Sequence, residues 1–489
     1  MVFPTIMPAN SVSGFNITNS LRLDDGGNSS LAFTAAAGNR QIFTLSFWTK
    51  RSNLPDAGMK LFDAGTSTDA DTGRFLVSFT GAAKLQVVGG ATTFRTTNRQ
   101  FRDPSAWYHI VIAVDTTDST AANRLKIYVN GVQESSFGDN NAVGENLNTP
   151  VNNNNNVHAI GHNQVSGNEH FDGYITEYYL IDGAQKAPAD FGESDDNGVW
   201  VPIKYDGTYG TNGFKLEFKQ TGTSANASGI GADTSGTGTH FAVTNLAATN
   251  VMIDSPTNNF CTLNPLDIDS TTPTISEGAL DYHSVANTQF NPIRSTFAVT
   301  KGKWYAEWKY INTAGFLGVI TTQSPLTGNI VSDADVRCIL RIPAGYYAVR
   351  NNSGSGTDIG DDSQTFSDND IGQVALDMDN GYVYFGINGT YLKGQDGSTT
   401  GNPAGNNGAA GGAANHPTQL LTDQHDGTNA FVAGDYVSGT TGQIQCNFGG
   451  GAPFAISSGN ADAKGHGNFE FAVPSGYFAL CTKNLAEFG

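Results

Sequence analysis

Charged residues and long apolar runs are both scarce in this sequence. Only 15% of its 489 residues are charged, and 26 Lys and Arg stand against 45 Asp and Glu, which gives a net charge of -19. Binding to nucleic-acid phosphates needs clustered basic residues, so we expect no nucleic-acid partner. The longest apolar runs, such as residues 110–114, have the length of a strand, whereas a bilayer span needs about 20 residues. We therefore expect no membrane insertion.

Cysteine is also rare. The four cysteines Cys261, Cys338, Cys446 and Cys481 are far apart and form no Cys-x-x-Cys pair. We predict free thiols in the core, with a bridge between Cys446 and Cys481 as the less favoured alternative. The N-terminal sequence lacks a basic start followed by a continuous apolar stretch, so we expect no secretory signal and synthesis in a cytoplasm.

Turn-forming residues are abundant. The chain has 59 Gly, and dipeptides such as Asn130-Gly131, Asp172-Gly173 and Asn388-Gly389 favour the positive backbone angles of tight hairpins. Helix signals are nearly absent, and aromatic residues, at 10%, recur along the chain as they do in folded β-proteins. We predict an all-β protein of two or three ordinary-sized units.

The first half of the chain shows the alternating pattern of β-strands. In residues 42–51, IFTLSFWTKR, Phe43, Leu45 and Phe47 share one face and Thr44 and Trp48 share the other, which predicts a half-buried strand. Similar strands follow at RFLVSF, KLQVV, WYHIVIAV and RLKIYVNG. We assign residues 1–189 to a first β-sandwich with an N-terminal extension.

The second half repeats this style from residue 284 to residue 489, beginning with GKWYAEWKY. Aligning the turns at Asn130-Gly131 and Asn388-Gly389 places LKIYV against VYFGI, each preceded by an apolar strand that ends in Asp. We predict one such antiparallel pair in each of two tandem sandwiches. Residues 190–283 form the expected connector, with short strands at VWVPIKY and FKLEF.

Residues 21–183 resemble a laminin G-like, concanavalin A-type domain, through LRL, LSFWTKR, LFDAG, WYHIVIAVD, IYVNG, AIG and FDGYITEYYLIDG in that order. The resemblance implies a sandwich with core aromatics near Trp48 and Trp107 and a late strand at the sandwich edge in FDGYITE. The second module resembles a SPRY domain, through GKWYAEWKY, GQVALDMDNGYVYFGING, IQCNFGG and GYFAL. SPRY domains are concanavalin A-like as well, so both modules imply jelly-roll sandwiches.

The combination of these modules with the connector resembles virion proteins of bacteriophages. It implies a tail fibre, head fibre or capsid decoration that is displayed on the particle exterior and contacts other virion proteins. It also implies a homo-oligomer, with a trimer plausible, and attachment to host surface polysaccharide. The alternative without a virion is a carbohydrate-binding adhesin on a bacterial surface. Fold resemblance alone does not give function.

An enzyme is the remaining alternative, because laminarinase-like glucanases share this sandwich and use paired carboxylates. Their Glu-x-Asp-x-Glu signature does not occur in the sequence, and the nearest approach, Glu193-Ser194-Asp195-Asp196, has no second glutamate. No Gly-x-Ser-x-Gly nucleophile motif and no phosphate-binding loop is present either. We expect no enzymatic activity and no required cofactor.

Oxygen-rich loops are the candidates for calcium. The segment TDIGDDSQTFSDNDIG brings together five aspartates, although it lacks the order of an EF-hand loop and is also typical of a solvated acidic loop. The weak calcium candidates are Asp358, Asp361, Asp362, Asp368 and Asp370. Asp69 and Asp71 form a similar, shorter group.

Exposed aromatic rings flanked by Asn, Asp and Gly are the candidates for stacking on sugars. The weak glycan-binding candidates are Tyr205, Tyr209, Tyr346 and Tyr347, although core packing is the more frequent role of such residues. We interpret His158, His162 and His170 as surface and turn histidines rather than metal ligands, and His109 as a hydrogen-bonded residue of the sandwich.

Overall fold

The computed structural model is almost entirely β-structure, as predicted, and carries one α-helix among the residues it describes. It describes residues 14–54, 58–65, 73–164, 167–268, 273–284, 291–312, 315–326, 337–342, 346–350, 356–360, 366–393, 399–407, 427–435 and 441–489. For residues 337–338, 341–342, 346–350 and 356–360 it describes the strand backbone alone. No helix in these ranges is long and apolar enough to cross a membrane.

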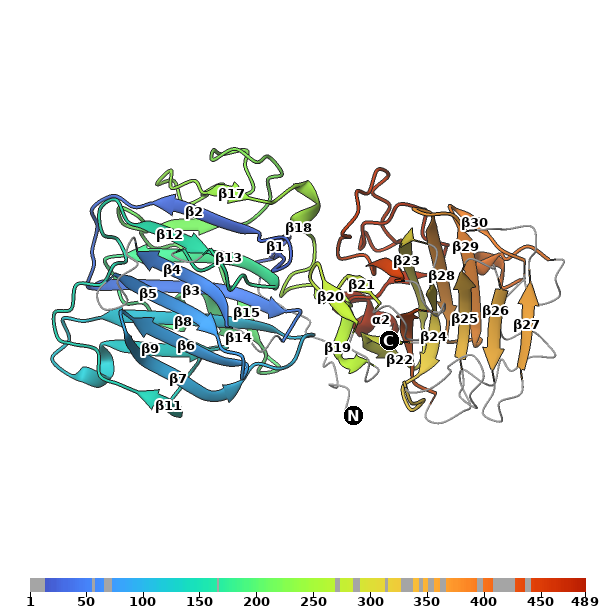
Figure 1. The fold of residues 1–489 in the computed structure, drawn as a ribbon, viewed down its shortest axis with the longest axis horizontal. Helices are drawn as coiled ribbons and strands as arrows, with labels where there is room; N and C mark the ends of the chain where they lie inside the picture. Colours follow the sequence, from blue (N-terminus) through green and yellow to red (C-terminus); the bar gives the residue numbers. More distant parts are fainter. Residues whose placement is uncertain are drawn as a thin grey trace. The chain divides into compact units, whose positions relative to one another are not determined.

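The chain divides by compactness into a first unit, Ser11–Asn258, and a second unit, Asn259–Gly489. The expected connector is shared between them, because residues 190–258 lie in the first unit and residues 259–283 in the second. Each unit contains two antiparallel sheets that form a sandwich (Figure 1). The fold class is therefore the predicted one.

In the first unit the two sheets have eight strands each. The first sheet runs, in spatial order, β10 (Val132–Gln133), β9 (Leu125–Val129), β8 (Trp107–Asp115), β3 (Ile42–Arg51), β13 (Gly173–Asp182), β1 (Ser20–Leu23) and β18 (Val251–Met252), and β16 (Phe214–Leu216) also pairs with β13. The second runs β11 (Phe137–Asn140), β7 (Thr92–Gln100), β6 (Lys84–Gly89), β5 (Arg74–Phe79), β4 (Met59–Gly65), β12 (Val157–Ile160), β2 (Ser30–Thr34) and β17 (Ala242–Thr244). A small hairpin joins β14 (Gly192–Ser194) to β15 (Trp200–Pro202).

The strand formed by FDGYITE is not at the edge of its sheet, contrary to the expectation. It begins β13, which pairs with β3 on one side and with β1 on the other. The chain returns to β1 from a distant part of the sequence, and periodicity cannot show which strands become neighbours.

The second unit also contains two sheets. One runs β19 (Leu263–Ile268), β22 (Ile293–Val299), β31 (Asn429–Gly434), β24 (Gly315–Thr321), β25 (Arg337–Ile342), β26 (Tyr346–Arg350) and β27 (Gly356–Gly360). The other runs β20 (Thr274–Ser276), β21 (Asp281–His283), β32 (Gln443–Asn447), β23 (Lys303–Asn312), β28 (Ile371–Asp377), β29 (Tyr382–Ile387) and β30 (Thr390–Tyr391), and β33 (Phe478–Ala479) pairs with β23. Trp308 of β23 packs on Phe431 of β31, which joins the two sheets.

The helical segments are short. Those in the described ranges are the 3-10 turns η1 (Ala121–Asn123), η2 (Pro188–Asp190), η3 (Ala248–Asn250) and η4 (Pro403–Gly405), and the C-terminal helix α2 (Thr482–Phe488).

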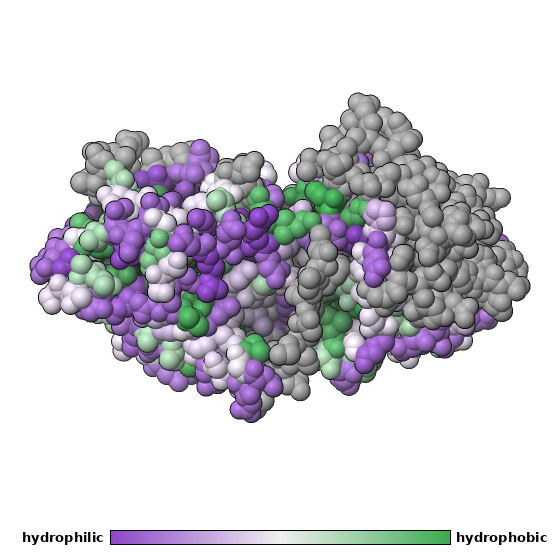
Figure 2. Space-filling model, turned by 90° about the horizontal axis from the view of Figure 1, so that it is seen from below, coloured by the Kyte–Doolittle hydropathy of each residue, from purple (hydrophilic) through white to green (hydrophobic). Residues whose placement is uncertain are grey.

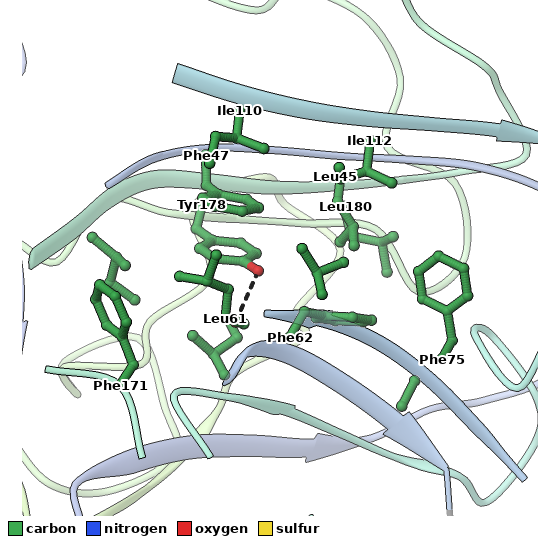
Figure 3. Packing of buried hydrophobic residues seen from close by; sticks show 14 of the residues in the cluster. Leu45, Phe47, Leu61, Phe62, Phe75, Ile110, Ile112, Phe171, Tyr178 and Leu180 are labelled. Atoms are coloured by element: carbon green, nitrogen blue, oxygen red, sulfur yellow. Dashed lines mark hydrogen bonds between the residues drawn. The ribbon is translucent and has the colours of Figure 1, made fainter. Parts of the chain in front are cut away.

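The core of the first sandwich is aromatic and aliphatic. Phe47 of β3 stacks on Tyr178 of β13 with ring centroids 4.6 Å apart (Figure 3). The hydroxyl of Tyr178 donates a hydrogen bond of 3.1 Å to the carbonyl oxygen of Leu61 in the facing sheet. Because this buried hydroxyl has a partner, tyrosine can fill the centre of the core without an unpaired polar group.

Strand β3 is buried on both faces, although its alternation predicted a half-buried strand. The second face is covered by residues that follow β13: Phe191 and Tyr205 pack with Val111, Tyr179 and Ile181 in a separate apolar cluster. Trp48 stacks on His109 on this same covered face. A strand with polar residues on one face can thus be buried on both faces when a later segment of the chain covers that polar face.

The internal repeat predicted from the two Asn-Gly turns is confirmed. Asn130 and Asn388 have φ of 46° and 49°, and the glycines that follow have φ of 79° and 86°. In both hairpins the asparagine Oδ1 accepts a backbone N–H, from His109 and from Ile371 respectively. Positive φ at two consecutive residues defines the tight turn that asparagine and glycine favour.

Three of the cysteines, Cys261, Cys446 and Cys481, are buried thiols that form no disulfide bridge, as predicted. The alternative bridge between Cys446 and Cys481 is therefore not formed. The side chain of Cys338 lies outside the described residues.

Apolar side chains are rarely exposed in the described part of the chain, where the large hydrophobic residues at the surface are Val132, Leu147 and Leu266. On the face of the first unit shown in Figure 2, hydrophilic residues predominate and apolar ones are scattered. Scattered apolar residues are normal on a protein surface and do not indicate an apolar docking patch.

Candidate functional site

Three carboxylates meet at one rim of the first sandwich. Asp24 and Asp25 follow β1, and Asp172 directly precedes β13, the strand beside β1. One oxygen from each residue lies within 4.8 Å of the others. Two ligands on opposite sides of Ca²⁺, each bound at about 2.4 Å, would be about 4.8 Å apart, so these hard oxygen donors fit a hard cation such as Ca²⁺. We call Asp24, Asp25 and Asp172 the acidic rim cluster.

The local backbone holds the acidic rim cluster in place. The Asp24 carboxylate accepts the N–H of Gly27, and Ser52 donates its hydroxyl to Asp172 at 2.6 Å. Asp24 and Asp172 are buried, and Asp25 is half-buried. Burial raises the pKa of the Asp25 carboxyl, and the neighbouring charge of Asp24 raises it further. The cluster thus concentrates negative charge that a cation would neutralise.

The sequence did not predict this cluster, because about 150 positions separate Asp24 from Asp172. The available signals were two turn motifs, Asp24-Asp25-Gly26-Gly27 and Asp172-Gly173, that flank strands of the laminin G-like pattern. Only the pairing of β1 with β13 brings them together.

Replacing Asp25 with asparagine is expected to stabilise the first unit by about 1 kcal/mol in EGTA at pH 7, since it removes one of three crowded negative charges. In the presence of calcium the wild type should be the more stable of the two proteins, because the variant lacks one ligand. Thermal unfolding with EGTA and with calcium chloride measures both effects, and the matched control is D206N at an exposed carboxylate. An equal melting temperature of the wild type in EGTA and in calcium chloride would exclude a calcium site at this rim.

A second polar network lies beside β4 and β5. The guanidinium of Arg74 contacts Asp63 at 2.5 Å and Asn163 at 2.6 Å, and Asn163 donates to Glu169 at 2.7 Å. Lys60 pairs with Glu169 at 3.2 Å. These charges balance one another, so this network stabilises the loop between β12 and β13 and leaves no excess charge for a metal.

The structure contradicts part of the interpretation of the histidines as surface and turn residues. His158 is fully buried, not at the surface: its Nε2 accepts the N–H of Asn152 at 3.0 Å, and its ring packs on Phe33. His170 is also buried, and its ring stacks on that of His162 with centroids 5.5 Å apart. His158 was misjudged because a hydrogen-bonded histidine in a turn-rich segment has the same local pattern whether it is exposed or buried.

His109 is hydrogen-bonded within the sandwich, as predicted. Its Nδ1 accepts the indole N–H of Trp200 at 3.0 Å, so Nε2 carries the proton and donates to the hydroxyl of Ser46 at 2.9 Å. Burial lowers the pKa of His109 to about 3. This histidine is neutral at physiological pH and holds the β14–β15 hairpin on the sandwich.

The glycan candidates lie in two places. The ring of Tyr205 is buried and stacks on Phe191 with centroids 5.0 Å apart, and Tyr209 packs edge-on against Tyr205 at 5.3 Å. This is the core packing that is the more frequent role of such residues. The side chains of Tyr346 and Tyr347 lie outside the described residues, although their backbone forms β26.

The calcium candidates of the second module are only partly described. Asp361 and Asp362 lie outside the described residues, as do the side chain of Asp358 and the shorter group of Asp69 and Asp71. Asp368 is exposed, while Asp370 accepts hydrogen bonds from the Ser367 N–H and the Asn388 side chain, both at 2.7 Å. Asp370 therefore closes the turn that precedes β28 and ties it to Asn388 at the end of β29.

One pair of glutamates has oppositely shifted pKa values, a pattern that can mark an acid and a base. Burial raises the pKa of Glu177, whereas Lys219 and Lys215 lower that of Glu217 to about 2 despite its own burial. The ammonium of Lys215 lies 3.3 Å from Glu177 and 3.1 Å from Glu217, and Tyr179 donates its hydroxyl to Glu177. Because Glu177 is only 3% exposed and Lys215 bridges both groups, this arrangement is an ion-pair cluster between β13 and β16.

A comparison with protein families matches residues 25–189 to the concanavalin A-like lectin/glucanases superfamily, in its laminin G form. This match confirms the laminin G-like prediction for the first sandwich. A comparison with curated proteins finds no match.

Among solved structures, the chain is similar to a Bacteroides ovatus protein whose assigned role is carbohydrate binding, with 14% identity, 47% of this chain and 58% of that one covered, and a TM-score of 0.33. It is also similar to the SPRY domain of human HERC1, with 12% identity, 38% and 96% covered, and a TM-score of 0.26. Domain 4 of the arabinanase AbnA from Geobacillus stearothermophilus, in complex with arabinotriose, has 20% identity, 31% and 64% covered, and a TM-score of 0.23. SPRY domains, which the second module resembles in sequence, are thus among the similar structures.

Proposed function

We propose that this chain is a non-catalytic glycan-binding protein of a bacteriophage virion, either a fibre or a capsid decoration. The observation that carries the glycan-binding part is the match of residues 25–189 to a domain family of lectins and glucanases. Within that family the lectin role is favoured, because the sequence has no Glu-x-Asp-x-Glu motif and Glu177 is buried behind Lys215.

The virion part of the proposal rests on the combination of a laminin G-like sandwich, a SPRY-like sandwich and the segment between them. In this role the chain assembles with other virion proteins and with copies of itself, as a trimer in a fibre. It is made in the host cytoplasm and acts on the particle exterior. Its sandwiches would contribute surfaces for assembly and loops for attachment to host polysaccharide.

Incubating the purified full chain with polysaccharide from the host surface tests the glycan part. We expect the protein to be retained on immobilised polysaccharide without releasing reducing sugar. Released sugar would instead establish a hydrolase, and absence of both retention and release would leave only a structural role. A free carbohydrate-binding adhesin would show the same retention but would be found on a bacterial surface rather than in particles, which antibody labelling of purified virions distinguishes.

A further inference from the structure

A polar groove of about 440 Å³ lies in the first unit, beside the edge of its second sheet. Strands β2 and β17 form one side, and residues 211–212 together with the segment between β16 and β17 form the other. Its volume falls within the range of about 300–1,000 Å³ that is typical of small-molecule sites. The groove is lined by Ala32, Phe33, Thr34, Ala36, Thr211, Asn212, Ala225, Gly238, Thr239, His240 and Ala242.

Most of this groove is built by residues outside the family match. From Thr211 onward the lining residues lie beyond the part that matches the lectin/glucanase family, which ends at residue 189. The groove therefore exists only because the Gly-, Ser- and Thr-rich segment packs against the sandwich edge.

The groove wall is held by the carboxylate of Asp233. Its Oδ2 atom accepts hydrogen bonds from the N–H groups of Gly238 and Thr239 and from the hydroxyl of Thr237, with donor–acceptor distances of 2.9, 3.1 and 2.9 Å. The same carboxylate accepts from both the N–H and the hydroxyl of Ser235 at 2.9 Å. A loop with so many internal hydrogen bonds is preorganised, which lowers the entropy cost of binding.

His240 and Asn212 are oriented in the same way. The Nδ1 atom of His240 accepts the N–H of Asp233 at 3.0 Å, so its Nε2 carries the proton and is a donor. Asn212 accepts the N–H of Ala36 at 2.8 Å and donates to the carbonyl of the same residue at 2.9 Å. The geometry of both side chains is therefore set before any ligand arrives.

The chemistry of the lining points to a neutral saccharide. None of the lining side chains is formally charged, and the polar ones are the hydroxyls of Thr34, Thr211 and Thr239, with the imidazole of His240 and the amide of Asn212. Between them lie alanine methyl groups, while the ring of Phe33 packs on Phe214 and Phe241 in the sandwich core. A sugar presents the same alternation of hydroxyl groups and apolar C–H faces. An anionic glycan would in addition be repelled by the net charge of -19.

We propose that this groove is the saccharide subsite of the first unit and that it takes neutral hexose chains. This inference rests on the proposed glycan-binding function and names the place and the ligand class. A peptide adding to the edge of β17 would rely on main-chain hydrogen bonds, whereas this groove offers mainly oriented side-chain groups.

The decisive variant is Ala242→Trp, which fills the groove from an exposed position of β17. Thr244→Trp is its matched control, because Thr244 is exposed on the same face of the same strand and does not line the groove. Isothermal titration of the full chain with cellohexaose, mannohexaose and galactohexaose should detect binding of at least one of them. A242W should weaken it at least tenfold and T244W less than twofold.

In a second pair of variants, each substitution replaces a threonine hydroxyl with a methyl group and keeps the shape of the side chain. Thr34→Val should weaken binding about fivefold, as expected for one hydrogen bond of about 1 kcal/mol, while Thr92→Val at an exposed position of β7 should not. Unchanged melting temperatures would show that each variant is folded.

Two results would overturn the inference and still leave the proposed function testable. If a neutral hexamer binds equally well to wild type and A242W, the site lies elsewhere while glycan binding stands. If no neutral hexamer binds, or sialyllactose and a sulfated galactan oligomer bind more tightly, the ligand class is wrong. Retention on intact host polysaccharide then decides separately whether the glycan-binding function survives.

Discussion

Replacing Asp254 with alanine is expected to destabilise the first unit by about 3–5 kcal/mol, because it removes the carboxylate from a buried ion pair. The ammonium of Lys50 lies 2.6 Å from Asp254, and the two side chains are 0% and 2% exposed. The indole of Trp107 also donates to Asp254 at 3.2 Å. The variant would leave the Lys50 charge in the interior without its carboxylate partner.

Urea denaturation of the full chain measures this loss of stability. Hydrogen exchange of peptides from β3 and β13 shows that the loss occurs in the first unit. The matched control is Asp206→Ala, which breaks an ion pair of 2.8 Å between two largely exposed side chains and should leave the stability nearly unchanged. Equal effects of the two variants would contradict the burial of Asp254. The result also tests whether residues 251–258 are part of the first unit, since Ser20 of β1 donates to the carbonyl of Asp254 at 2.6 Å.

The second large effect concerns Glu307 in β23, which is fully buried. Burial raises the pKa of its carboxyl to about 7, although hydrogen bonds from the N–H groups of Phe471 and Glu470 and from the hydroxyl of Tyr305 lower it. Because a tyrosine hydroxyl can accept as well as donate, Glu307 can hold a proton without losing this contact. The folded state therefore binds the proton more tightly than the unfolded state.

The sign of the pH dependence follows from this shift. Between about pH 4.5 and pH 7 the folded state keeps the Glu307 proton and the unfolded state has lost it, so the free energy of unfolding falls as pH rises. From the ordinary value of 4.5 to about 7, the loss amounts to about 3 kcal/mol. Below pH 4.5 and above pH 7 this group contributes no further slope.

Hydrogen exchange of β23 and β28 peptides between pH 4 and pH 8, corrected for intrinsic rates, measures this dependence. His466 contributes a slope of opposite sign, because burial lowers its pKa, so the informative quantity is wild type minus Glu307→Gln. That difference should show the full loss, whereas Asp368→Asn, at an exposed position, should leave the profile unchanged. A flat difference between pH 4.5 and pH 7 would show that Glu307 is ionised throughout.

Much of the fold followed from the sequence because the signals were local. Alternation over residues 42–51 defines a strand, and Asn-Gly pairs define tight hairpins, because each depends on residues only a few positions apart. The family of the first sandwich was accessible for a related reason: its motifs occur in a fixed order, and residues 25–189 match that family.

The candidate sites could not be predicted from such local signals, because their residues are distant in sequence. Asp24 and Asp172 meet only through the pairing of β1 with β13, and the groove forms only when the segment after β16 packs beside β2. The tyrosines at positions 205 and 209 had the local context of exposed residues, yet Tyr205 is covered by Phe191.

By itself, then, the sequence determined the all-β class, the two tandem sandwiches, their repeated hairpins and the excess of acidic over basic residues. Tertiary structure decided which faces are buried, where the acidic rim cluster forms and that the Gly-, Ser- and Thr-rich segment builds a groove. The physical reason is that strand and turn propensities act over a few residues, whereas burial and convergence of polar groups depend on which distant segments pack together.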